Sequence, residues 1–102
     1  MINKGLFGEQ IRLLREEKTL SLREVAEQIG IDTSLLGKIE RNDRQPTKEQ
    51  IKLIAKFFKL NEKDLLKEFI SDQIAYKILE EGVDLDTLKV AEMKIEYLKS
   101  KK

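Results

Sequence analysis

A glycine between two helix-start signals most constrains what this chain can fold into. Ser21 and the glutamate three positions later form a capping box, the pattern that marks a helix N-terminus. Gly30 is suited to end the helix that follows, and Asp32 is suited to cap the next one. We therefore predict two short helices, at about 21–29 and 32–41, joined by a tight turn that contains glycine.

Three further helices are predicted in the first two thirds of the chain, because apolar residues recur there at helical spacing. They span about 7–18, 47–60 and 62–69, with Pro46 as a stop before the second and Asn61 as the cap of the third. The expected core consists of apolar residues on one side of each of the five helices: Phe7, Ile11, Leu14, Val25, Ala26, Ile29, Leu36, Ile39, Ile51, Ile54, Ala55, Phe58, Leu65, Leu66 and Phe69.

The remaining residues, 70–102, are predicted to form a two-helix extension. Ser71 is the expected cap of its first helix, and Gly82 is expected to end that helix. Asp84 or Asp86 is expected to open the last helix. Apolar residues recur there at steps of three and four: Leu85, Leu88, Ala91, Ile95 and Leu98. The whole chain is therefore expected to be all-α.

The composition excludes several classes of protein. The chain of 102 residues has no cysteine and no histidine, which excludes a disulfide framework, thiol catalysis and the usual zinc sites. No stretch approaches the ~18 apolar residues of a membrane span, so we expect a cytoplasmic protein without a membrane partner. The acidic pairs Glu80/Glu81 and Asp84/Asp86 lack a basic or nucleophilic neighbour. We therefore expect no enzyme, no metal, no cofactor and no small-molecule ligand.

Two motifs between Leu20 and Leu60 carry a family resemblance. They read "LSLREVAEQIGI" and "KIERNDRQP", and they resemble the Cro/repressor-type (XRE-like) helix-turn-helix transcription regulators. The resemblance covers roughly residues 7–69. It implies a five-helix lambda-repressor-like DNA-binding domain at 1–69, with 70–102 outside it. The positions that match the family pattern without gaps are Ala26, Gly30, Ile39, Glu40, Arg41 and Pro46.

The resemblance implies that the helix at 32–41 lies in the major groove of double-stranded DNA and reaches the base edges. Lys38 can donate to guanine O6 and N7, and Leu35, which we expect to face outward, can pack on a thymine methyl group. Gly37 weakens the helix but would let it approach the DNA closely. The expected base contacts are Thr33, Ser34, Leu35, Gly37 and Lys38.

Phosphate contacts are expected at two places. The family usually has a phosphate-binding glutamine directly after the capping serine. Because this chain has Leu22 there, only the backbone N–H groups of Leu22 and Arg23 remain for that contact. Arg41, Asn42 and Arg44 occupy the loop positions that the family uses for phosphates. Asn42 replaces the usual glycine and is suited to the same left-handed backbone.

The resemblance also implies a structural ion pair between Arg15 and Glu40, which would fix the angle of the helix at 32–41. Two unconnected surface charges are the alternative interpretation.

Charge is unevenly distributed along the chain: the net charge is only +1, whereas residues 33–59 hold seven basic and three acidic residues, a local balance of +4. Such an asymmetry is expected of a DNA-binding face, although the lysines at 48–59 also suit an ordinary solvated helix.

A homodimer is expected because regulators of this kind bind palindromic DNA as twofold dimers, with half-sites about 34 Å apart. The core does not require Leu53 and Phe57, and the apolar stripe of residues 71–98 has no evident partner in residues 7–69. The alternative is that residues 71–98 fold back as a cap on their own domain. The expected dimer interface is Leu53, Phe57, Ile74, Ile78, Leu88, Ala91, Ile95 and Leu98.

The sequence thus predicts a dimeric, sequence-specific transcription regulator that acts on a palindromic operator near its own promoter. Its small size favours a restriction–modification controller, with a phage-type repressor and an antitoxin-type regulator as alternatives. A protein-interaction module that uses the same helices is the competing class, and the local balance of +4 argues against it.

Overall fold

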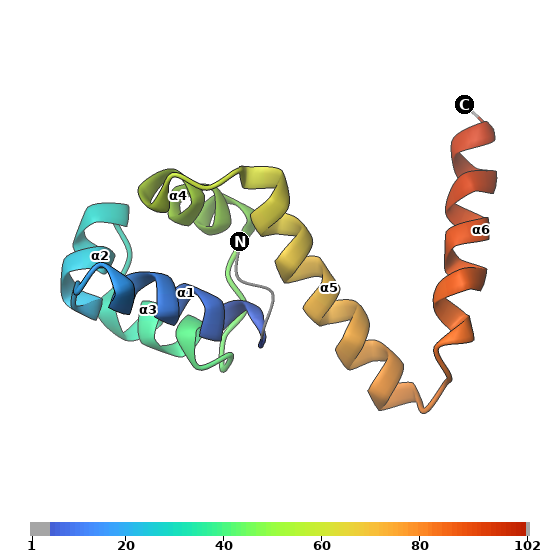
Figure 1. Cartoon of the computed structure of the whole chain (residues 1–102), viewed down its shortest axis with the longest axis horizontal. Helices are drawn as coiled ribbons and strands as arrows, with labels where there is room; N and C mark the ends of the chain where they lie inside the picture. Colours follow the sequence, from blue (N-terminus) through green and yellow to red (C-terminus); the bar gives the residue numbers. More distant parts are fainter. Residues whose placement is uncertain (1–4, 102) are drawn as a thin grey trace. The chain divides into compact units, whose positions relative to one another are not determined.

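The computed structural model describes residues 5–101 as six α-helices without a strand (Figure 1), so the all-α prediction is confirmed. The chain divides into two compact units, with the boundary between Asp72 and Gln73. No helix in the described part is long and apolar enough to cross a membrane. The helices are α1 (Phe7–Glu17), α2 (Leu22–Ile29), α3 (Thr33–Glu40), α4 (Lys48–Phe58), α5 (Glu62–Glu81) and α6 (Asp86–Ser100).

Helix α2 begins and ends, and α3 begins, at the residues that carry the start and stop signals. The Glu24 N–H donates to Ser21 Oγ at 3.0 Å, and the Ser21 N–H donates to the Glu24 carboxylate at 2.8 Å. The latter hydrogen bond lowers the pKa of the exposed Glu24 carboxyl. Gly30 ends α2 with a φ of 76°, in the left-handed region that favours glycine. Asp32 occupies the N-cap position of α3 without a side-chain cap hydrogen bond.

The core of the first unit is built from residues that the helical spacing predicts. It lets α3 pack against α1 and α2, and α2 against α4. Leu14, Leu66 and Phe69 were also expected in the core and are partly buried against it. Each large side chain buried here contributes about 1.5–3 kcal/mol to folding. The buried apolar residues are Phe7, Ile11, Val25, Ala26, Ile29, Leu36, Ile39, Ile51, Ile54, Ala55, Phe58 and Leu65.

Residues 68–72 of α5 contact the N-terminal part of α1, a connection that the sequence did not reveal. The Phe7 N–H donates to the Asp72 carboxylate at 2.8 Å, and the side-chain amide of the buried Gln10 donates to Glu68 at 2.8 Å. The Phe7 and Phe69 rings meet edge to face at 5.6 Å. Partial burial raises the pKa of Asp72, against the lowering effect of the Phe7 hydrogen bond. Residues up to Asp72 therefore belong to the first unit.

The prediction that Ser71 caps a separate helix is wrong. Residues 62–69 and the segment that follows form one uninterrupted helix, α5. The Ser71 hydroxyl donates to the Glu68 carbonyl oxygen at 2.9 Å, a bond that a serine inside a helix can make with the preceding turn. The segment 62–81 contains neither glycine nor proline, so nothing in it forces the helix to end. The cap predicted at Asn61 is confirmed, since its side chain accepts from the Asp64 N–H at 3.0 Å.

The second unit consists of the last residues of α5, a short connection and α6. Gly82 follows α5 with a φ of 66°, so the predicted break is confirmed. Asp84 accepts a hydrogen bond from the Asp86 N–H at 3.0 Å just where α6 begins. No residue of α6 is buried.

Candidate nucleic-acid interface

One side of α3 is buried and the other is open to solvent. Leu36 and Ile39 point into the core, whereas Thr33, Ser34 and Lys38 are exposed. At about 100° per residue, Ser34 and Lys38 lie on the side of the helix opposite to Leu36 and Ile39. Thr33 is exposed in the first turn of α3. The open side therefore begins at the N-terminal turn of α3 and offers two hydroxyl groups and one ammonium group.

Leu35 does not face outward, as we expected it to. It is partly buried and packs against the core, at the edge between the buried and the open side of α3. The reason is geometric: around the helix axis, Leu35 lies closer to Leu36 and Ile39 than to Thr33. The part of Leu35 that remains exposed borders the open side.

Gly37 is buried, and two side chains lie over it. A Cβ atom at this position would be 3.2 Å from Nη1 of Arg41 and 3.7 Å from Cδ1 of Leu22. Glycine at this position therefore leaves room for the Arg41 guanidinium beside the start of α2. The sequence suggested a close approach to DNA, and the structure adds this contact within the chain.

A shallow hollow surrounds Gly37 and carries positive charge. Its volume is about 190 Å³, and it is lined by Arg12, Arg15, Leu22, Gly37, Glu40 and Arg41. The lining thus contains three arginines and one glutamate next to the N-terminus of α2, and Arg12 and Arg41 are also paired with the exposed Glu16 and Asp43. An excess of guanidinium groups beside a helix N-terminus is suited to an anion such as a DNA phosphate.

Arg12 is a candidate site residue that the sequence analysis missed. It lies three positions before Arg15, and residues at that spacing share one side of a helix. The spacing of Arg12 and Arg15 was the signal in the sequence that could have identified Arg12 as a site residue. Arg12 is paired with Glu16 at 3.1 Å, but both side chains are largely exposed, so this pair is weak.

The expected phosphate-binding residues differ in their exposure and in their hydrogen bonds. Arg44 is exposed, and Arg23 is exposed with its guanidinium 3.2 Å from Glu27. Arg41, at the end of α3, donates a hydrogen bond to the Asp43 carboxylate, with a distance of 3.3 Å between the two atoms. The Asn42 side-chain oxygen accepts a hydrogen bond from the Gly8 N–H at 2.9 Å, so this atom is engaged within the fold.

The ion pair that the resemblance implied between Arg15 and Glu40 is present. Nε and Nη2 of Arg15 donate to the two carboxylate oxygens of Glu40 at 2.8 and 3.0 Å. Only 12% of the Arg15 side chain and 4% of the Glu40 side chain are exposed. Nη1 of Arg15 also donates to the Leu20 carbonyl oxygen at 2.8 Å. Hydrogen bonding to Glu40 raises the pKa of Arg15. The pair thus connects α1 to the end of α3 and to the residue before the α2 cap.

The residues expected at a dimer interface fall into the two units. Leu53 and Phe57 lie in the first unit, where they are partly buried and pack against the core. The other six belong to the second unit, and five of these are exposed while Ile78 is partly buried: Ile74, Ile78, Leu88, Ala91, Ile95 and Leu98.

Two short helices joined by a tight turn, with the second one open along one side beside basic groups, define a helix-turn-helix DNA-binding domain. The chain belongs to the XRE-type helix-turn-helix family, since the family model described as "Helix-turn-helix" matches residues 11–65. It is therefore a DNA-binding transcription regulator, as the sequence predicted.

Several solved structures are similar to this chain. The restriction-modification controller protein C.AhdI from Aeromonas hydrophila is 32% identical over 58% of this chain and 89% of its own, with a TM-score of 0.54. SinR in complex with DNA is 32% identical over 60% of this chain and 98% of its own, with a TM-score of 0.55. A comparison with curated proteins found no match.

A third structure extends the likeness to nearly the whole chain. A chain of the SinR/SinI complex is 24% identical over 93% of this chain and 99% of its own, with a TM-score of 0.56. At this identity the likeness concerns the fold alone. It covers helices of the second unit as well as the helix-turn-helix domain.

Proposed function

We propose that this protein is a sequence-specific regulator that binds a palindromic operator as a homodimer, with α3 in the major groove. The observation that carries this proposal is the open side of α3, where Thr33, Ser34 and Lys38 stand next to the basic hollow around Gly37. Hydroxyl and ammonium groups at the start of such a helix are suited to base edges, and the arginines are suited to the flanking phosphates.

Within this class we favour a restriction–modification controller that regulates its own promoter. The support is the 32% identity to the controller protein C.AhdI over 58% of this chain. An antitoxin-type regulator and a phage-type repressor remain the alternatives, and a protein-interaction module is the competing class. We propose no catalytic role, no cofactor and no small-molecule ligand.

The test is a selection of random DNA fragments by the purified full chain, followed by titrations of the selected site at several salt concentrations. We expect a palindromic consensus with half-sites about 34 Å apart and a steep loss of affinity as salt rises. An affinity for the selected DNA that is unchanged by salt, or no enrichment of any sequence, contradicts the proposal and favours an interaction module.

Leu35→Ala is expected to weaken binding to the selected site about tenfold while weakening binding to random DNA much less, because apolar contact with a thymine methyl group is sequence-specific. Competition titrations against both DNAs measure this difference. Leu13→Ala is the matched control, since Leu13 is 43% exposed on α1 and outside the open side of α3. Equal losses on both DNAs would remove Leu35 from the base-reading residues.

Arg12→Ala is expected to weaken binding to all DNA sequences about equally and to lower the slope of log affinity against log salt by about 1, as the loss of one phosphate contact does. Its exposed pair with Glu16 contributes little, so stability should change by less than about 0.5 kcal/mol. Lys67→Ala, an exposed cation on α5, is the control. An unchanged salt slope would show that Arg12 is an ordinary surface residue.

A further inference from the structure

Gly37 belongs to the open side of α3, yet it is buried. At about 100° per residue, it lies about 60° from Ser34 around the helix axis and about 100° or more from Leu36 and Ile39. Ser34 and Lys38 on the open side are exposed, whereas Gly37 is buried. Its burial therefore comes from side chains that lie over it on the open side, and not from the core.

The side chain of Arg41 lies over Gly37. Arg41 follows Gly37 by four positions, so the two residues are on the same side, and a helical side chain points back toward the N-terminus. A Cβ atom at Gly37 would lie 3.2 Å from Nη1 of Arg41, closer than such contacts ordinarily are, and 3.7 Å from Cδ1 of Leu22. A larger side chain at this position would therefore displace the guanidinium group.

The Arg41 guanidinium keeps donors for a group from outside the chain. Its Nε donates to Asp43 at 3.3 Å, and this is the hydrogen bond that the side chain makes within residues 5–101. The Glu40 carboxylate is engaged elsewhere, since both of its oxygens accept from Arg15. With 60% of the Arg41 side chain exposed, its two Nη nitrogens remain open to a ligand.

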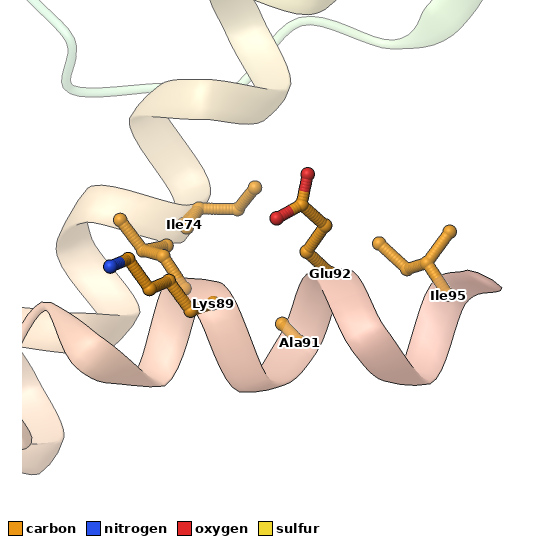
Figure 2. Close-up of a pocket in the computed structure, with 6 residues that line it drawn as sticks. Ile74, Lys89, Ala91, Glu92 and Ile95 are labelled. Atoms are coloured by element: carbon orange, nitrogen blue, oxygen red, sulfur yellow. The ribbon is translucent and has the colours of Figure 1, made fainter. Parts of the chain in front are cut away.

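The ligand that these nitrogens suit is an anion. The hollow around Gly37 is lined by three arginines and one glutamate. The larger hollow of the second unit, about 460 Å³, is lined by four apolar residues with Lys89 and Glu92, one charge of each sign (Figure 2). Guanidinium groups bind phosphate through parallel N–H donors, so the phosphate backbone of DNA fits the hollow around Gly37.

We propose that Gly37 is a positioning residue, which leaves the surface of α3 free for the Arg41 guanidinium so that its Nη nitrogens meet a DNA phosphate. This inference rests on the DNA contact through α3 in the proposed function and deepens it. Gly37 then acts through Arg41, and the DNA meets the arginine at this point. The close approach suggested by the sequence is the competing role, in which the DNA meets the helix itself.

The first test compares Gly37→Leu, Arg41→Ala and the double variant of the full chain in titrations with random-sequence duplex DNA at several salt concentrations. Each single variant is expected to lose about tenfold in affinity and to lower the slope of log affinity against log salt by about 1, as the loss of one phosphate contact does. The double variant is expected to match Arg41→Ala, because Gly37 acts only through Arg41. A double variant whose loss is the product of the two single losses overturns the proposal.

Arg44→Ala is the matched control for this cycle. Arg44 is an exposed arginine after α3, and none of its atoms lies within 4 Å of the Cβ position at Gly37. Its loss and that of Gly37→Leu are therefore expected to multiply in the double variant. If the pair with Arg44 behaves like the pair with Arg41, Gly37 does not act through Arg41 and the proposal is overturned.

Gly37→Ala keeps the test decisive if leucine disturbs the fold. Its methyl group requires Arg41 to move by a few tenths of an ångström. We expect about a threefold loss of affinity, absent in the Arg41→Ala background, with an unchanged or higher melting temperature. Unchanged affinity in both Gly37 variants overturns the proposal. Random-sequence DNA requires neither a palindrome nor a dimer, so a failed operator selection would not affect these results.

Discussion

Gly8→Ala is expected to destabilise the protein by about 3 kcal/mol, because the added methyl group has no space. Its Cβ would lie 2.2 Å from the Ile39 carbonyl oxygen, 2.6 Å from the Glu40 carbonyl oxygen and 2.6 Å from Oδ1 of Asn42. The two carbonyls belong to the backbone at the end of α3, which cannot yield without moving the helix. The same move would stretch the hydrogen bond from the Gly8 N–H to Asn42.

Urea unfolding followed by circular dichroism measures this effect, and Gly37→Ala is the matched control. A Cβ at Gly37 meets only the flexible end of Arg41 at 3.2 Å and Leu22 at 3.7 Å. Alanine inside a helix is favoured over glycine by about 1 kcal/mol, so the control should be neutral or more stable. If Gly8→Ala proves as stable as Gly37→Ala, α1 and α3 do not approach each other as closely as the structure shows.

Glu40→Ala is expected to lower the free energy of unfolding by about 3 kcal/mol and to weaken DNA binding at the same time. The substitution leaves the shielded Arg15 guanidinium without the carboxylate that accepts two of its hydrogen bonds. Because this pair connects α1 to the end of α3, its loss frees the orientation of α3. We expect DNA affinity to fall about tenfold, the equivalent of about 1.4 kcal/mol.

Unfolding and DNA titrations of the same preparations test both effects of Glu40→Ala. The matched control is Glu16→Ala, which removes the exposed partner of Arg12 and should cost less than about 0.5 kcal/mol. A loss of DNA affinity with an unchanged melting temperature would mean that Glu40 contacts the DNA or its hydration shell, and would contradict the structural assignment.

The helix starts and stops were predictable because they depend on neighbouring residues. The capping box at Ser21, the left-handed Gly30 and the left-handed Asn42 all appear where their residue types favour them. Ser71 shows the limit of this reasoning. A serine can cap a helix or sit inside one, and its surroundings decide which of the two occurs.

The candidate site was predictable in part. The open positions Ser34 and Lys38 follow from helical spacing, since they are opposite to Leu36 and Ile39, and Thr33 is open in the first turn of α3. Arg12 was missed because its role depends on where α1 crosses α2 and α3. The contacts of Gly8 with the end of α3 have the same origin and leave no local signal in the sequence.

By itself, the sequence determined the helices other than the extent of α5, the apolar residues that form the core and the helix-turn-helix family, because each of these depends on residues close together along the chain. Only the tertiary structure decided that α5 continues past Ser71, that Gly8 and Gly37 are sites of close packing, and that Arg12 joins Arg41 at one hollow. These features require residues distant in sequence to meet, and the packing of whole helices decides which of them do.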